Sequence, residues 1–425
     1  MNFIPPEDEG RLRAAASGVL PNGKPVVVNT DGTVSVVSGI AQALGSAVVF
    51  ESANTSWISS TFDSSNNKVV IAYQDVGNSN YGTVIVGTVS GTAISFGTAV
   101  VFESATVYNV SATFDSNANK VVISYRDAGN SNKGTALVGT VSGTNISFGT
   151  AVIFFNGSCQ QISSTFDSNV NKVVITFQSL VSSPNPGTAI VGTVSGTGIS
   201  FGTAAVFNNA NTTAAVVTFD SSANKVVIAY RDTGNNSYGT AIVGTISGTN
   251  ISFGAEVVFN SGNLGQIGLG YDATAQKIVI AYRNVGNSNY GTAIVGTVSG
   301  TGISFGTAAV YNTAAVGTYS SVVYNASIQK TVIFYSDGGT ANYGTFIVAK
   351  ISGTSISFGT KSIFEEATPN FIAAVYDSNA QKIAIVFQSS GTGSYGTAIV
   401  SQTGSLNITA ENYVGMSGGV VSFTG

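Results

Sequence analysis

The residues of this sequence that are most regularly spaced and could do chemistry are carboxylates that follow an aromatic residue. They recur every 52 or 53 residues, at Asp63, Asp115, Asp167, Asp220, Asp272 and Asp377. In the sixth repeat Asn325 takes the equivalent place. Glycoside hydrolysis needs two carboxylates that converge on one bond, whereas these are distributed singly before short turns. Asn325 loses the carboxylate but keeps the geometry with which Asx side chains cap turns. The pattern therefore predicts turn capping and not catalysis.

Other catalytic groups are missing from the composition. The sequence has no His, which excludes Ser-His-Asp and Cys-His catalysis and His-ligated zinc. Cys159 is the only cysteine, so there is neither a disulfide framework nor a cysteine-based metal site. The segment DVGNSN (75–80) offers oxygen ligands for calcium, but its spacing falls short of an EF-hand loop. We predict no catalytic residue, no metal and no cofactor, and hence a protein that is not an enzyme.

Aromatic and amide side chains are better candidates for a binding site. They lie in short segments that differ most from one repeat to the next: Trp57, Tyr108, Gln160, Gln161, Tyr319 and Phe371. Aromatic rings stack on sugar rings, and amides hydrogen-bond to sugar hydroxyls. The alternative is that these side chains plug a channel or pack between neighbouring sheets.

Three arginines occupy equivalent places in their repeats: Arg126, Arg231 and Arg283. A sialidase-like site would use an arginine cluster for a carboxylated sugar, but four other repeats have Gln or Ser at this place. Equivalent positions on different repeats need not point at one spot. We therefore predict local Arg–Asp pairs, with Asp127 and Asp232, or solvated loops.

The elements that position these residues form seven repeats of about 52 residues. The first complete copy contains four runs rich in Val, Ile, Thr, Phe and Tyr: Ser59–Phe62, Val69–Tyr73, Thr83–Val89 and Ile94–Phe102. Turn residues separate the runs, so each run is predicted to be a strand. Four strands in one repeat match a blade of a β-propeller. Small residues such as ISST (58–61) suit an innermost strand at a crowded channel.

The two ends of the repeated region are complementary. The outer-strand signature ISFG occurs six times, and the seventh repeat stops after YGTAIV (395–400). Near the N-terminus, AVVFESA (47–53) is identical to residues 99–105. The sequence thus predicts an all-β, seven-bladed β-propeller of four-stranded blades, closed by an N-terminal strand that completes the last blade. In that fold the diverging segments lie near the mouth of the channel.

We expect three regions: an N-terminal segment (1–39) with a possible short helix (Glu9–Ala16) and a hairpin around residues 29–32, the propeller (40–404), and a C-terminal extension (405–425). Charged residues make up only 8% of the chain and there is no basic patch, which argues against nucleic-acid binding. No signal peptide is visible, and Gly and Thr interrupt every apolar run, so no membrane insertion is expected.

Three stretches carry a resemblance to a known family: GVLPNGKPVVVNTDGTVSVV (18–37), the repeated GNSNYGTAIVGTVSG (for example 286–300), and LNITAENYVG (406–415). They resemble virion proteins of tailed bacteriophages, especially tail-fibre and tail-associated proteins of marine phages. The resemblance implies a structural or receptor-contacting component of an extracellular particle, made in the host cytoplasm. It carries no catalytic motif to this sequence.

The leading hypothesis is a non-enzymatic virion protein that contacts the host surface or decorates the particle. Its partners would be other virion proteins and a host cell-surface glycan or protein receptor, with a homo-oligomer as a further option. The alternative is a free carbohydrate-binding lectin of propeller type. A hydrolase is a third hypothesis, but it requires a carboxylate cluster outside the repeat register, and the sequence shows none.

Overall fold

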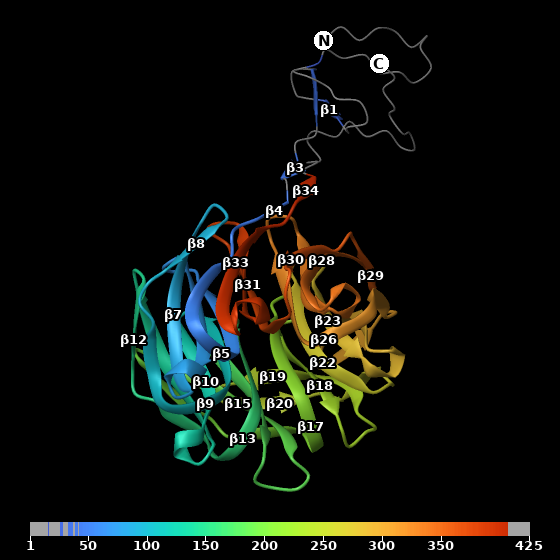
Figure 1. The fold of residues 1–425 in the computed structure, drawn as a ribbon. Coiled ribbons are helices and arrows are strands. Elements are labelled where there is room, and N and C mark those ends of the chain that lie inside the picture. Colours follow the sequence, from blue (N-terminus) through green and yellow to red (C-terminus); the bar gives the residue numbers. More distant parts are fainter. Residues whose placement is uncertain (1–15, 17–25, 29–32, 37–38, 41, 407–425) are drawn as a thin grey trace. The chain divides into compact units, whose positions relative to one another are not determined.

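The computed structural model describes residues 16, 26–28, 33–36, 39–40 and 42–406, and these residues form an all-β structure (Figure 1). Their helices are single 3-10 turns: η1 (Val76–Asn78), η2 (Ala128–Asn130), η3 (Val285–Asn287), η4 (Gly338–Thr340) and η5 (Ser390–Thr392). None of the helices in this part of the chain has the length and apolar character needed to cross a lipid bilayer.

One repeat illustrates the architecture. Its strands are β5 (Val48–Asp63), β6 (Lys68–Asp75), β7 (Tyr81–Ser90), β8 (Ala93–Phe96) and β9 (Val100–Asp115). Each strand pairs antiparallel with the next up to β8, and β9 also pairs with β7. The middle strand β6 is almost fully buried, because neighbouring sheets cover both of its faces.

The predicted fourth strand, Ile94–Phe102, is wrong as a single element. The chain leaves β8 at Phe96 and begins β9 at Val100. Gly97 makes this turn, donating its N–H to the Val86 carbonyl at 2.9 Å, and a Cβ there would lie 2.2 Å from the Thr144 carbonyl oxygen. The fourth run then continues into the first strand of the next repeat, so that one 16-residue strand serves two sheets.

The same pattern recurs along the chain, and the long strand is divided in two places, between β21 and β22 and between β30 and β31. The remaining strands are β10 (Lys120–Asp127), β11 (Lys133–Ser142), β12 (Asn145–Phe148), β13 (Val152–Asp167), β14 (Lys172–Ser179), β15 (Pro186–Ser195), β16 (Gly198–Phe201), β17 (Ala205–Asp220), β18 (Lys225–Asp232), β19 (Tyr238–Ser247), β20 (Asn250–Phe253), β21 (Val257–Asn260), β22 (Leu264–Asp272), β23 (Lys277–Asn284), β24 (Tyr290–Ser299), β25 (Gly302–Phe305), β26 (Ala309–Asn325), β27 (Lys330–Asp337), β28 (Tyr343–Ser352), β29 (Ser355–Phe358), β30 (Ser362–Glu365), β31 (Pro369–Asp377), β32 (Lys382–Ser389) and β33 (Tyr395–Gln402).

The sheets pack against one another through their first strands. These strands contact in the order β5, β9, β13, β17, β22, β26 and β31, and β31 contacts β5 again. Small hydroxyl side chains make the contact close: Ser59 Oγ accepts a hydrogen bond from the Ala112 N–H, and Ser111 Oγ accepts one from the Ser164 N–H, both at 3.0 Å. Bulkier residues would separate these backbones, which explains why the first strands are rich in Ser, Ala and Thr.

The last repeat takes its outer strand from the N-terminal side. Strand β5 pairs antiparallel with β33, with Val48 opposite Ala398 and Asn54 opposite Tyr395. The Gly45 N–H also donates to the Val400 carbonyl at 2.9 Å. This confirms the pairing expected from the copied AVVFESA segment and joins two parts of the chain that are more than 300 residues apart.

The recurring Asx residues cap turns, as predicted. Asp63 Oδ1 accepts hydrogen bonds from the Ser65 and Asn66 N–H groups at 2.9 and 3.0 Å. The equivalent residues of the other repeats make the same type of bond, including Asn325 with the Ser327 N–H at 3.0 Å. These residues are almost fully buried, and Oδ1 of each accepts from the backbone of its own turn.

The chain divides into two compact units, one of which is Leu44–Ser401. In the other, β1 (Val26–Val28) pairs antiparallel with β2 (Val34–Val36), as the predicted hairpin requires, and β3 (Gly39–Ile40) pairs with β34 (Ser405–Leu406). Ala16 forms a parallel bridge to Val34. Apart from Ala16, the predicted helix Glu9–Ala16 lies outside the described residues, as do the hairpin turn (29–32) and residues 407–425 of the C-terminal extension.

Candidate functional site

A cavity of about 230 Å³ opens where the first strands meet. Every repeat contributes one equivalent residue to its lining, 52 or 53 positions after the last: Trp57, Asn109, Gln161, Ala214, Gln266, Tyr319 and Phe371. The residues that follow them, such as Ile58 and Ser59, also line the cavity. Seven equivalent positions therefore surround one cavity, and the side chains differ at most of them.

A β-bulge presents these residues to the cavity. The pairing of β5 with β6 shifts register between Ser56 and Ser59, and Trp57 within the bulge has φ of 50°. Asn109, Gln161 and Phe371 share this conformation, with φ of 51°, 58° and 50°. Left-handed backbone is costly for side chains of this size, and bulges commonly re-aim a side chain next to functional sites. Trp57, Asn109 and Gln161 thus lie inside the 16-residue strands β5, β9 and β13.

Aromatic rings line one side of the cavity as a continuous arc. Ring centroids lie 4.5 Å apart for Tyr319 and Phe371, and 5.4 Å apart for Phe371 and Trp57. Tyr108 extends the arc, with its ring edge-on to Trp57 at 6.5 Å, although it does not itself line the cavity. All four rings are half-buried. Trp57, Tyr319 and Phe371 thus pack against one another and still present surface to the cavity, which combines the two alternatives considered from the sequence.

Amides occupy the opposite side. Gln161 Oε1, in the third repeat, accepts a hydrogen bond from the Ala214 N–H at 2.9 Å, which orients the amide. Gln266 lines the cavity from the fifth repeat. Gln160, the other predicted glutamine, does not line it. Its Nε2 donates to Gln178 Oε1 at 2.6 Å, so Gln160 supports the strand pairing.

A second cavity of about 130 Å³ adjoins the amide side and shares Gln161, Ala214 and Gln266 with the first. Its lining includes Arg231 and Arg283. Equivalent positions on different repeats need not point at one spot, but for this pair they line the same cavity. Adjacent sheets bring the ends of β18 and β23 together there.

The predicted Arg–Asp pairs are wrong. Arg231 Nε donates to Thr213 Oγ1 at 2.7 Å, and another guanidinium nitrogen donates to the Leu264 carbonyl at 3.2 Å. Arg126 donates to Asn132 Oδ1 at 2.9 Å and lies over the Tyr108 ring. Asp127 and Asp232 instead accept from backbone N–H groups of their own turns.

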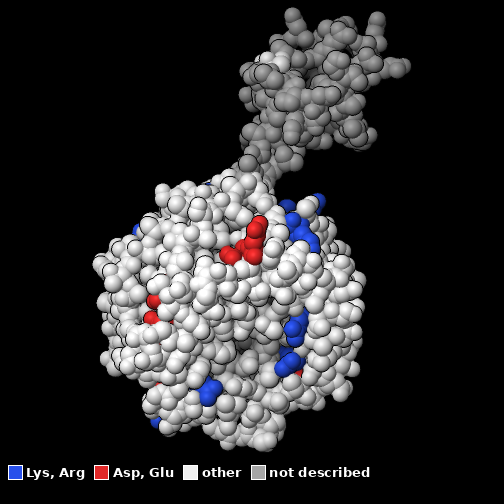
Figure 2. Space-filling view, viewed as in Figure 1, with Lys and Arg blue, Asp and Glu red and all other residues white. Residues whose placement is uncertain are grey.

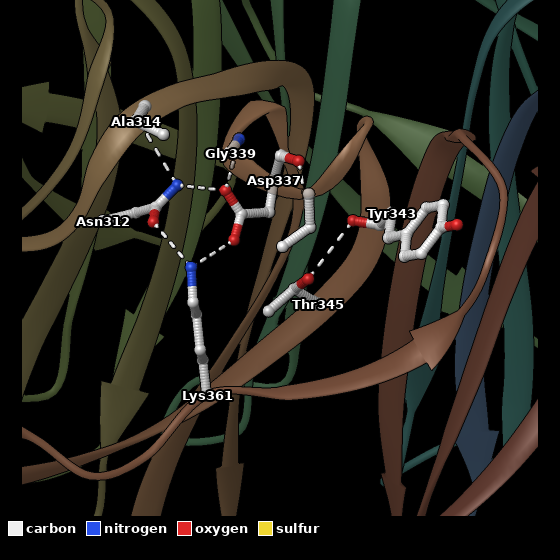
Figure 3. A network of polar contacts seen from close by, with 8 residues as sticks. Asn312, Ala314, Asp337, Gly339, Tyr343, Thr345 and Lys361 are labelled. Atoms are coloured by element: carbon white, nitrogen blue, oxygen red, sulfur yellow. Dashed lines mark hydrogen bonds and ion pairs between the residues drawn. The ribbon is translucent and has the colours of Figure 1, made fainter.

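Desolvation and the like charge of Arg283 lower the pKa of Arg231. The surface seen in Figure 2 carries few charged side chains outside small groups. The ion pair that the structure shows among the described residues does not involve these arginines. Lys361 binds Asp337 Oδ2, and Asn312 Nδ2 donates to Asp337 Oδ1 at 2.8 Å (Figure 3).

In the described part of the chain no three His, Cys, Asp or Glu side chains cluster as metal ligands. The cavity lining contains no carboxylate. Sequence reasoning missed Asn109, Ala214 and Gln266, although counting 52 or 53 residues from Trp57 would have found all three.

Comparisons with known proteins bear on the fold. No protein-family model matches the chain, and no curated protein matches it. Among solved structures, the periplasmic gluconolactonase of Pseudomonas aeruginosa is similar with a TM-score of 0.50 and 12% identity, over 76% of this chain and 92% of that one. AofleA from Arthrobotrys oligospora has a TM-score of 0.45 and 8% identity, over 83% and 95% of the two chains. A Dyadobacter fermentans protein of unknown function has a TM-score of 0.49 and 9% identity, over 70% of this chain and 94% of that one.

The similarity to the gluconolactonase, a β-propeller, together with the repeated antiparallel sheets, shows a β-propeller-like fold. At this identity the likeness extends to the fold and no further.

Proposed function

We propose that the repeats form seven blades of a closed β-propeller and that the protein binds a saccharide at the mouth of the central channel, without chemical turnover. The return of contacts from β31 to β5 and the pairing of β5 with β33 support the closed ring. The N-terminal strand completes the seventh blade.

The observation that carries the binding function is the asymmetry of the cavity. Tyr319, Phe371 and Trp57 form an aromatic surface on one side, while Gln161 and Gln266 face the same cavity from the other. A sugar ring offers an apolar face for stacking and hydroxyls for hydrogen bonds. Because the seven equivalent positions carry different side chains, the proposed site is a single composite one and not seven copies.

The biological setting that we propose is a phage particle, where the propeller would contact a glycan of the host surface. The support for this setting is the sequence resemblance to tail-fibre and tail-associated proteins. The alternative, a free lectin, uses the same cavity and differs only in what the chain ends are attached to.

Trp57 provides a direct test, because it is the only tryptophan of the chain and lies in the cavity. Its fluorescence should change saturably when the correct saccharide is titrated from a panel of bacterial surface oligosaccharides. Trp57→Ala should weaken binding of a labelled saccharide by about two- to tenfold, since one stacked ring contributes about 0.5–1.5 kcal/mol.

The matched control is Tyr343→Ala, which removes an aromatic side chain at the start of β28, outside the cavity. It should leave saccharide affinity unchanged. Labelled protein should also bind host cells, and lose that binding once surface glycans are stripped. Binding that survives stripping, or that Trp57→Ala leaves intact, would contradict the proposal.

A further inference from the structure

Building on the proposed saccharide site, we propose that the ligand is acidic and that its carboxylate or sulfate group binds between Arg231 and Arg283 in the adjoining cavity. Arg283 Nε is buried without a partner, two like charges lie together, and the two cavities share lining residues.

Arg283 lacks the side-chain partner that the other two arginines have. In the second, third and fourth repeats a side chain lies opposite this position: Tyr108 lies under Arg126, Gln160 bonds to Gln178, and Thr213 bonds to Arg231. The fifth repeat has Gly265 there, and a Cβ on it would lie 2.6 Å from Arg283 Nε. Glycine thus gives room to the guanidinium but offers it no acceptor.

The Nε of Arg283 is consequently buried with no hydrogen-bond partner. Buried polar atoms without a partner are uncommon in folded proteins, and each costs about 1–3 kcal/mol. An oxyanion would satisfy this donor. The planar guanidinium fork matches the geometry of carboxylate and sulfate oxygens.

The charges at this place also favour an anion. Arg231 and Arg283 line one cavity, and no carboxylate is present in its lining. Burial and, after it, the positive charge of Arg283 lower the pKa of Arg231. Only 8% of the residues of this chain are charged, so two arginines without an acidic partner are a specific feature. A bound anion would relieve their repulsion.

The two cavities can serve a single ligand because Gln161, Ala214 and Gln266 belong to both linings. A sugar ring on the aromatic arc could therefore extend an acidic substituent past these residues to the arginine pair. The proposed site would therefore bind one class of ligand, the acidic saccharides.

The acid-binding part is tested first with inorganic sulfate and acetate, at constant ionic strength, by calorimetry. We expect saturable binding by the full chain and a loss of about tenfold or more in Arg283→Gln, as for a charge-assisted hydrogen bond. Gly265→Thr should have a similar effect with no change of net charge, because the new side chain displaces Arg283 and supplies the kind of acceptor that Thr213 supplies to Arg231.

Lys277→Gln is the matched control. It removes the same charge from the opposite end of β23 and should leave anion binding unchanged. Absence of saturable binding by the native chain would overturn the proposal. An equal loss of anion affinity in Lys277→Gln and Arg283→Gln would also overturn it, because it would show that only long-range electrostatics act.

A second arm compares dextran, carboxymethyl-dextran and dextran sulfate, which share one backbone. Arg283→Gln should weaken the binding of carboxymethyl-dextran and dextran sulfate but not that of dextran. Whichever of the two acidic dextrans binds the native chain more tightly identifies the preferred acid group. Equal binding of neutral and acidic dextran would overturn the acidic class while the saccharide function stands. If inorganic sulfate binds but no dextran does, the arginine site stands and the saccharide function loses support.

Discussion

Gln388 Nε2 donates a hydrogen bond to the Thr55 carbonyl oxygen at 2.5 Å, across 333 positions of the sequence. The same bond joins neighbouring repeats elsewhere, as between Gln74 Nε2 and the Val107 carbonyl at 2.6 Å. Only the first of these bonds lies where no peptide chain connects the two repeats directly. It therefore holds the junction between β5 and β33 together with their backbone pairing.

Gln388→Leu is accordingly expected to loosen this junction. It leaves the buried Thr55 carbonyl without that donor, at a cost of about 1–3 kcal/mol. Hydrogen exchange should accelerate in residues 48–54 and in β33. Gln74→Leu removes the equivalent bond between two repeats that the peptide chain connects directly. It should not accelerate hydrogen exchange in residues 48–54 or in β33. Equal exchange in the two variants would show that this bond has no special role in closure.

Asp220→Ala should destabilise the turn after β17. Asp220 Oδ1 accepts hydrogen bonds from the Ser222 and Ala223 N–H groups, both at 3.0 Å, and is almost fully buried. We expect a loss of about 1–3 kcal/mol in urea unfolding. Asp220→Asn should cost far less, because Asn325 makes the same bond in the sixth repeat. If Asn and Ala are equally destabilising, the carboxylate charge matters and the capping account is incomplete.

The contact of Lys361 with Asp337 should make stability depend on pH. Burial by itself raises the pKa of Asp337, but hydrogen bonds from Lys361, Asn312 and Gly339 outweigh it and the net shift is downward (Figure 3). A lowered pKa in the folded state stabilises the protein above the unfolded-state pKa, and this contribution is lost as pH falls toward the folded-state value.

Lys361→Met should therefore cost most at neutral pH, and its difference from the native chain should shrink in acid. Urea unfolding at pH 7 and at pH 3 measures both. Lys350→Met removes an exposed lysine from β28 and should show no such trend. A constant gap for Lys361→Met at both pH values would contradict the assignment.

Cys159 should be inert in the native protein. It is completely buried, and burial raises the pKa of its thiol to about 12, although the positive charge of Arg126 opposes the shift. Thiol reagents react with the thiolate, so labelling at pH 8 should be very slow until the chain is unfolded. Rapid stoichiometric labelling of the folded protein would show that β13 opens readily.

The aromatic arc provides a further test of how the cavity is built. Phe371 touches both Tyr319 and Trp57, whereas Tyr108 touches the arc at its edge. Phe371→Leu should therefore shift the Trp57 fluorescence and weaken saccharide binding severalfold. Tyr108→Leu should affect binding less, because Tyr108 does not line the cavity. The reverse order would place the ligand nearer to Arg126.

The sequence by itself determined the repeat, the strands apart from the break between Phe96 and Val100, the capping role of the Asx residues and the pairing of AVVFESA with the last repeat. These features follow from local chemistry and from copying: residue types select strand or turn, and an identical segment fits an identical partner. It also singled out Trp57, Gln161, Tyr319 and Phe371, which line the cavity, because their segments vary where structural ones repeat.

Only the tertiary structure decided which side chains share a cavity. Tyr108 and Gln160 lie one position before the lining residues, and the bulge turns the following residue inward instead. Arg231 and Arg283 are 52 residues apart in sequence but meet where two sheets converge. Spacing along a chain gives the period of a repeat, whereas the angle between adjacent sheets and the bulge within each strand set the distances between side chains.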